Sequence, residues 1–467
     1  MKFNQFRLFL FLSSLILLSS CLGTTTVTTT STDPTFVSLT FAGNDSITKA
    51  VFTLVDKTIV NLDSLPYKTR IDSVYPTFKF VSTAGARFYF PGGNKYKKDS
   101  AVVTGTDTID FRQPVYIRNW ASDGITSIPY TIQVNVHKVD PEVYNWSKVS
   151  DNLNSTNATS QKTVVKNDTL FYYSNDGTTA KLNISTDGYT WNDQSVKLSG
   201  LPVNTPLKDM ILFNGKIYLT QDGANIYSSS NGFNWTKKAV TDFTFKSLAY
   251  ALLNNQQQLE LWAVVQSTAD ATYRFAKSTD GDHWGLTAGN IPDNFPVKDF
   301  ASVSYSSSTG KAKVLVSGGY SATDNVNALK NNWSSEDGVY WVDFSNENHT
   351  LDTLAVGASI ISYDNKLFAF GTRRDRVGNY YRISKDEGLS WQIPDTLRNK
   401  LPLDLTLRNY QSVVVFKPSA LKGVQTPDKK QQILLSNRIF IIGGFTGTTS
   451  YSDVWTGKLN RKNFLRQ

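Results

Sequence analysis

Short runs of alternating apolar and polar residues dominate this chain after its first 20 residues. Such alternation is typical of half-buried β-strands, because successive side chains of a strand point to opposite faces of the sheet. The runs 114–118 and 130–136 are clear examples, and glycine- and asparagine-rich turns separate many of the later runs. We therefore expect an all-β protein.

Seven or eight short strands are expected between residues 35 and 140. This number of strands over roughly 100 residues fits an immunoglobulin-like β-sandwich. From residue 141 to the end the runs are organised differently, because a turn motif repeats along them. We therefore place the boundary between two domains at about residue 140.

The repeated motif contains a Ser, an Asp or Asn, a Gly and a Trp, and it occurs five times. The tryptophans follow one another at intervals of 44, 49, 57 and 50 residues, a period that suits one four-stranded propeller blade. The turn acids or amides and their tryptophans are Asp187 with Trp191, Asn231 with Trp235, Asp280 with Trp284, Asp337 with Trp341, and Asp386 with Trp391.

Each residue type of the motif suits a tight hairpin. Gly accepts positive φ without penalty, while Asp and Asn bond to their own turn backbone. The Trp supplies a large apolar surface where the strand leaves the turn. The motif resembles the Asp-box hairpin of sialidase-like propellers, and this resemblance implies a folding role remote from any ligand.

Six apolar second strands can be counted in the repeat region, which predicts a six-bladed β-propeller, with seven blades as the alternative. The pair Gly443-Gly444, followed by Tyr451 and Trp455, resembles a kelch repeat. The segment 144–149 resembles a fourth strand without its own hairpin, so we expect it to complete the last blade. The alternative is local closure by residues 463–465.

The amino terminus has the pattern of a signal peptide over residues 1–20. Lys2 and Arg7 precede a run at 8–18 that is almost entirely apolar and too short to span a bilayer. Cys21, the only cysteine in the 467 residues, follows two serines, and this junction resembles the lipobox of bacterial lipoproteins. We expect Cys21 to be lipidated and residues 21–34, which are rich in Thr, to form a tether. The alternative is an ordinary signal peptide.

Composition and charge limit the classes of binding partner that we expect. The formal charge is +9, but the basic residues are dispersed, and no basic run is interleaved with aromatic residues. We therefore expect no nucleic-acid partner. Partners expected instead are the membrane, through the lipid anchor, and a glycan or an envelope protein.

The segment 110–134 is similar to the end of the immunoglobulin-like modules that follow the lipidated Cys in Bacteroidetes surface lipoproteins. The chain as a whole resembles uncharacterised propeller lipoproteins of that group. The resemblance implies attachment to the outer membrane and leaves the periplasmic or surface side open. It supplies no activity.

Catalytic signatures are weak in this sequence. Sialidases use an arginine triad, a Tyr nucleophile with a Glu partner, and an Asp, yet residues 141–240 contain no Arg. His137, His283 and His349 show no metal-ligand spacing, and we expect neither a metal nor a cofactor. A non-catalytic binding lipoprotein is the favoured interpretation. A carbohydrate-active hydrolase or lyase and a structural envelope protein are the alternatives.

Ligands are expected on the face opposite the box turns, where loops between second and third strands emerge. The densest arginine cluster of the chain lies in one such loop. Guanidinium groups suit carboxylates or sulfates, which would favour an acidic sugar. The residues predicted to contact a ligand are Arg373, Arg374, Arg376 and Tyr380, with Tyr320 and Phe445 as apolar walls. Locally paired surface charge is the alternative interpretation of this loop.

Overall fold

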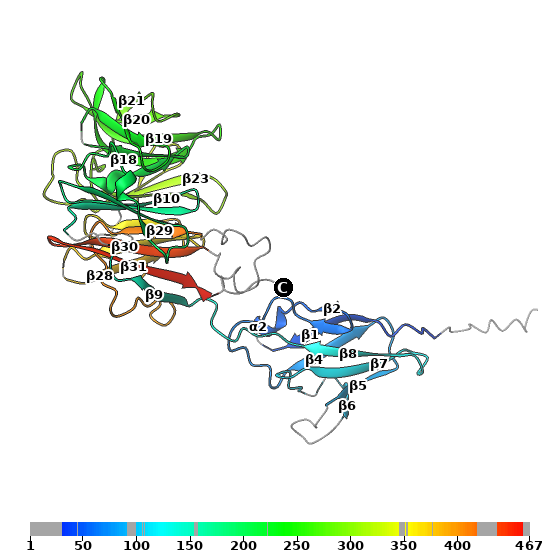
Figure 1. The fold of residues 1–467 in the computed structure, drawn as a ribbon. Helices are drawn as coiled ribbons and strands as arrows, with labels where there is room; N and C mark the ends of the chain where they lie inside the picture. Colours follow the sequence, from blue (N-terminus) through cyan, green and yellow to red (C-terminus); the bar gives the residue numbers. More distant parts are fainter. Residues whose placement is uncertain are drawn as a thin grey trace, which may run out of the picture. The chain divides into compact units, whose positions relative to one another are not determined.

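The computed structural model describes residues 30–43, 45–90, 100–104, 106, 108–153, 157–221, 223–344, 351, 354–375, 377–417 and 437–460. Cys21, the signal-peptide region and Arg376 lie outside these residues. The chain divides into two compact units, with the division between Val139 and Asp140. The regular secondary structure of each unit is almost entirely β-strand (Figure 1).

The first unit has eight strands in two sheets around one hydrophobic core. One sheet pairs β1 with β4, and the other has the order β2-β3-β8-β7-β5-β6. Strand β3 is parallel to β8, whereas the other pairs are antiparallel. The short helix α2 was not expected from the sequence. The elements are β1 (Phe36–Ala42), α2 (Asp45–Thr48), β2 (Thr53–Val55), β3 (Thr58–Val60), β4 (Tyr75–Phe80), β5 (Gly85–Tyr89), β6 (Ser100–Val102), β7 (Val115–Trp120) and β8 (Ser127–Gln133).

The second unit contains six antiparallel sheets, numbered here in chain order. Sheets 1 to 3 are β10 (Ser160–Lys166), β11 (Thr169–Asn175), β12 (Ala180–Ser185) and β13 (Asn192–Asp193); β14 (Ile211–Phe213), β15 (Lys216–Thr220), β16 (Asn225–Ser229) and β17 (Thr236–Ala239); and β18 (Phe243–Leu253), β19 (Leu259–Ser267), β20 (Tyr273–Ser278) and β21 (Gly285–Asn290). Sheets 4 to 6 are β22 (Ala301–Ser306), β23 (Ala312–Ser317), β24 (Asn332–Ser335) and β25 (Val342–Asp343); β26 (Ser359–Tyr363), β27 (Lys366–Thr372) and β28 (Asn379–Ser384); and β29 (Ser412–Phe416), β30 (Arg438–Thr446), β31 (Thr449–Leu459) and β9 (Tyr144–Ser150).

The first strands of the six sheets, which are β10, β14, β18, β22, β26 and β29, contact one another in a closed circle. They are therefore the innermost strands of a ring. Sheet 6 is completed by β9, which pairs antiparallel with β31 although the two lie about 300 residues apart. The expected closure by segment 144–149 is confirmed, and a seventh sheet is not found among the described residues of this unit.

The five box turns share one pattern of hydrogen bonds at one end of the sheets. In the first turn the Gly188 N–H donates to Ser185 Oγ at 2.8 Å. The Tyr189 and Thr190 N–H groups both donate to Asp187 Oδ1 at 2.7 Å. The other four turns bond to Asn231, Asp280, Asp337 and Asp386 through corresponding Ser, Gly and backbone N–H groups. These turns therefore satisfy their own backbone.

The box glycines also hold neighbouring sheets together. Each has positive φ, and a Cβ at Gly188 would lie 2.3 Å from the Phe440 ring of sheet 6. The corresponding neighbours of Gly232, Gly281 and Gly338 are Phe171, Tyr218 and Trp262, each from the preceding sheet. Only Gly fits between the turn and that sheet.

The box tryptophans differ in burial. Trp235 is 6% exposed and packs edge-on against Tyr173 of sheet 1, while the other four are half-buried. Sheet 5 departs from the expected four strands. After its box turn, Gln392 forms only an isolated bridge to Ile383 instead of a fourth strand.

Candidate functional site

A cavity of about 600 Å³ lies at the end of the ring opposite the box turns. Its lining comes from two kinds of segment: the connections that enter an innermost strand and the loops between second and third strands. Successive strands of an antiparallel sheet run in opposite directions, so both kinds of segment emerge at the same end. The cavity therefore opens where the sequence predicted a ligand face.

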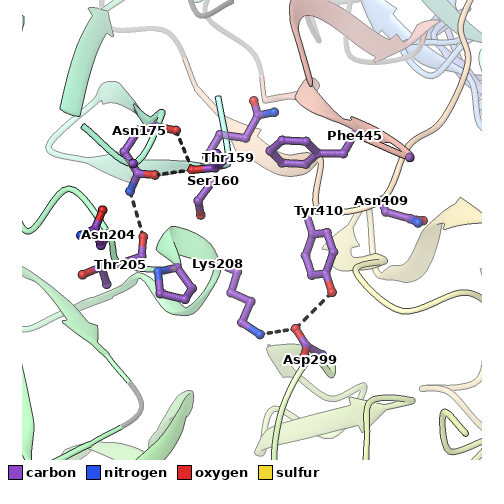
Figure 2. Close-up of a pocket in the computed structure, with 14 residues that line it drawn as sticks. Thr159, Ser160, Asn175, Asn204, Thr205, Lys208, Asp299, Asn409, Tyr410 and Phe445 are labelled. Carbon is purple, nitrogen blue, oxygen red and sulfur yellow. Dashed lines mark hydrogen bonds and ion pairs between the residues drawn. The ribbon is translucent and has the colours of Figure 1, made fainter. Parts of the chain in front are cut away.

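Three side chains from sheets 2, 4 and 6 meet on one side of the cavity. The Lys208 ammonium forms an ion pair with Asp299, and the Tyr410 hydroxyl donates to Asp299 Oδ1 at 3.2 Å (Figure 2). The Lys208 and Asp299 side chains are 26% and 11% exposed. Burial raises the pKa of Tyr410, and the neighbouring Asp299 carboxylate adds to this rise. We call Lys208, Asp299 and Tyr410 the polar floor.

Two members of the polar floor have backbone conformations that favour glycine. Asp299 has φ +60° and Tyr410 has φ +54°. Each lies two residues before the innermost strand of its sheet, and the corresponding residue of sheet 5 is Gly357, with φ +79°. A non-Gly residue in this region costs of order 1–3 kcal/mol, and such strain often occurs at functional sites. Asp299 and Tyr410 therefore share the backbone conformation that Gly357 adopts in sheet 5, and Asp tolerates this conformation better than Tyr does.

Gly357 itself supports the polar floor. The Tyr410 N–H donates to the Gly357 carbonyl at 2.6 Å. A Cβ at Gly357 would lie 2.8 Å from the Tyr410 nitrogen and 2.9 Å from its Cγ. The close approach of sheet 5 to Tyr410 therefore requires a residue without a side chain.

The walls of the cavity are aromatic on one side and rich in amides and hydroxyls on the other. Phe445 lies near Tyr410, whereas Thr159, Asn175 and Thr205 form the polar side (Figure 2). Asn175 donates from Nδ2 to the Thr205 carbonyl at 2.8 Å and accepts from Thr159 Oγ1 at 3.1 Å. These bonds fix the polar wall before any ligand arrives.

A second polar layer adjoins the polar floor. Burial raises the pKa of Asp209 to about 6, and the Asp299 carboxylate acts in the same direction. Lys208, Lys162 and a hydrogen bond from Ser247 oppose this rise. Burial also lowers the pKa of Lys162, while Asp209 counteracts that shift. Lys162 and Asp209 thus act on each other electrostatically.

The residues predicted to contact a ligand are only partly brought together. Phe445 lines the cavity, and the half-buried Tyr320 lies beneath Lys298, whose ammonium is 5.8 Å from the ring centroid. Arg373 pairs with Asp375 at 2.6 Å, and Arg374 donates to the Ala328 carbonyl at 2.6 Å. Neither arginine lines the cavity.

Tyr380 corrects the expectation of a single ligand-facing loop. It is 1% exposed, because it lies within β28 and packs in a hydrophobic cluster that joins sheets 4 and 5. A ligand at the surface does not reach a side chain in that position. Arg376 lies outside the described residues, so its role stays a prediction.

Sequence reasoning missed Lys208, Asp299 and Tyr410. A usable signal was present, because Gly318-Gly319 and Gly443-Gly444 are each followed by an aromatic residue, Tyr320 or Phe445. Bridges pair these aromatics with Lys298 and Asn409, the residues just before Asp299 and Tyr410. Matching sheet 4 with sheet 6 in this way would have drawn attention to both positions.

The described residues contain no cluster of three or more His, Cys, Asp or Glu side chains able to hold a metal ion. Among the same residues, no helix has the length and apolar character needed to cross a membrane.

Comparison with protein families assigns both units. The description "DUF6242 beta propeller domain" covers residues 140–467, and the DUF6242 N-terminal domain, of unknown function, covers residues 21–134. The chain belongs to the DUF6242 family. The second unit of this DUF6242 protein is therefore a β-propeller, as the sequence predicted, and the family assignment brings no activity with it.

Solved structures similar to this DUF6242 chain are distant. YjhT is 11% identical over 66% of this chain and 96% of its own, with a TM-score of 0.42. An endo-arabinase from Bacteroides thetaiotaomicron is 14% identical over 54% of this chain and 99% of its own (TM-score 0.31). A fucose lectin from Kordia zhangzhouensis, solved with methyl-fucoside, is 11% identical over 31% and 95% (TM-score 0.22). No curated protein matches the chain.

Proposed function

We propose that this protein binds a glycan in the cavity of its propeller and does not cleave it. The observation that carries the proposal is the lining of the cavity. The aromatic rings of Phe445 and of Tyr410, which belongs to the polar floor, lie opposite a polar wall with Asn175, Asn204 and Thr205. Binding sites commonly combine apolar surface with a few well-placed polar groups. Sugars match this combination, because their rings have apolar faces and their edges carry hydroxyls.

The carboxylates of the cavity argue against hydrolysis. Most glycoside hydrolases need two carboxyl groups about 5–10 Å apart across the scissile bond. Asp299 is the only carboxylate among the described residues that line the cavity, and it is paired with Lys208. The proposal therefore assigns Asp299 to the binding surface.

A hydrolase or lyase is the second candidate, and one contact favours it. The Tyr410 hydroxyl donates to Asp299, an arrangement in which a carboxylate could accept the proton of an attacking phenol. The raised pKa of Tyr410 works against this role. Release of reducing sugar by the wild type, abolished by Tyr410→Phe, would establish the second candidate in place of the first.

The envelope location is a proposal from the sequence. Cys21 after a signal-like segment supports a lipid anchor, with residues 21–34 as a tether. Replacing Cys21 by Ala should release the protein from the membrane fraction. A Cys21→Ala protein that still sediments with membranes would contradict the anchor, and proteolysis of intact cells would assign the side.

The glycan proposal is tested by screening the purified protein on a glycan array and measuring each hit by calorimetry. We expect binding to at least one oligosaccharide with one site per chain. Absence of binding to every glycan, combined with capture of an envelope protein through the same face, would replace the proposal by a protein-binding role.

A further inference from the structure

The charges of the cavity cancel. Lys208 and Asp299 are the only charged side chains among the described residues that line it, and they form an ion pair with each other. The adjoining layer again combines one base, Lys162, with one acid, Asp209. The chain carries a net charge of +9, yet the described residues that line the cavity have no net charge.

Asp299 is held by two contacts at the edge of the cavity. It has the left-handed backbone that Gly357 adopts in sheet 5, a conformation that Asp tolerates better than most non-Gly residues. Its Oδ1 accepts from both Lys208 and Tyr410. A glycine at this position would allow the same backbone but would leave the Lys208 ammonium without its ion-pair partner.

We infer that the cavity selects uncharged saccharides and that the Lys208–Asp299 pair excludes acidic ones. This inference rests on the glycan-binding function proposed above. A uronate or sulfate entering the cavity would have to displace Asp299 from Lys208 or give up water beside the Asp299 carboxylate. Both are unfavourable, because a charge removed from water needs a partner. Uncharged hydroxyl groups do not incur this cost. The selectivity would therefore come from an unfavourable interaction with the acidic ligand.

The decisive variant is Asp299→Asn. Asn accepts left-handed backbone more readily than most residues, so the local conformation should survive. Its amide oxygen can still accept a hydrogen bond from Tyr410, but Lys208 loses its ion-pair partner, and Asp209 remains as the acid that acts on it. Charge-assisted hydrogen bonds are roughly twice as strong as neutral ones. We expect affinity for acidic saccharides to rise about tenfold or more.

A second variant separates charge from shape. Asp299→Asn combined with Lys208→Met removes both charges, so the gain in affinity for acidic saccharides should disappear while binding of neutral saccharides persists. Thermal unfolding of each variant checks that the propeller is folded. A folded Asp299→Asn protein with an unchanged preference would overturn the inference.

The probes are matched pairs that differ only in charge, such as tetragalacturonate and its full methyl ester, added to the glycan array. Wild-type binding restricted to uncharged members supports the inference. Tighter wild-type binding to acidic members overturns it while leaving the glycan-binding function in place. Binding to no glycan of either kind overturns the proposed function itself, and the inference with it.

Discussion

The two ends of the propeller use repetition differently. At the box end, five turns repeat the same Ser, Asp or Asn, Gly and Trp with the same hydrogen bonds, for example around Asp187 and Asp337. At the cavity end, equivalent positions diverge: the left-handed residue before the innermost strand is Asp299 in sheet 4, Gly357 in sheet 5 and Tyr410 in sheet 6.

This difference separates residues that build the ring from residues that serve a site. A box turn satisfies its own backbone and seals a neighbouring sheet, so every copy needs the same chemistry. At the cavity end the relaxed solution is Gly357, and departures from it bring Asp299 and Tyr410 together. Divergence between equivalent positions therefore points to a site, whereas the conspicuous repeat points to a structural role.

The largest expected effect is a loss of stability caused by a substitution at the box end. Trp235→Ala should lower the free energy of unfolding by about 3–5 kcal/mol, because this indole is 6% exposed and packs against Tyr173. Trp391→Ala should cost less, since Trp391 is half-buried. Denaturant unfolding measures both, and calorimetry should find glycan affinity per folded molecule unchanged. Lost binding in a stable Trp235→Ala protein would make the box a ligand site.

The next variant should lower both the stability of the protein and its affinity for a glycan. Gly357→Ala should destabilise the protein by roughly 2 kcal/mol, because Ala is strained at φ +79° and its Cβ would crowd Tyr410. Unlike Trp235→Ala, it should also weaken glycan binding by displacing Tyr410. Paired unfolding and calorimetric measurements test this. Full affinity in the destabilised variant would show that the position of Tyr410 does not matter.

A smaller effect should appear in binding only. Phe445→Ala should reduce glycan affinity about tenfold, equivalent to about 1.4 kcal/mol, through loss of the aromatic wall. Tyr340→Ala is the matched control, because Tyr340 lies in a box turn and is 79% exposed. Calorimetry on both variants checks the assignment. Equal losses in the two would remove the distinction between the two ends of the propeller.

The smallest effect concerns pH. Burial raises the Asp209 pKa from 3.8 to about 6, so between these values the folded protein holds a proton that the unfolded chain releases. The stability contributed by neutral Asp209 is therefore present below about pH 4 and is lost as the pH rises through 6. Asp209→Asn should flatten this dependence in unfolding measured from pH 4 to 7. The difference between 3.8 and about 6 corresponds to at most about 3 kcal/mol, and solvent screening of this half-buried carboxyl reduces that figure. Identical pH profiles for variant and wild type would contradict the raised pKa of Asp209.

Particular residues show how far sequence reasoning reached. The strand runs, the five box turns and closure by 144–149 could be predicted because each depends on local periodicity or on a repeat. Phe445 was predicted as a ligand wall from its loop, and it lines the cavity. Tyr380 was misplaced because both faces of this sheet are packed: Tyr380 lies in one hydrophobic cluster, and the neighbouring Tyr381 lies in another.

The sequence by itself determined the repeating architecture, since turn chemistry and period-two patterning act over a few residues and leave a visible trace in each copy. Only the tertiary structure decided the site. Lys208, Asp299 and Tyr410 follow one another at intervals of about 90 and 110 residues. Their meeting depends on ring closure and on a backbone conformation that the residue types do not predict. Charge cancellation in the cavity is a property of that meeting, because it arises from the distance between two side chains and not from either residue alone.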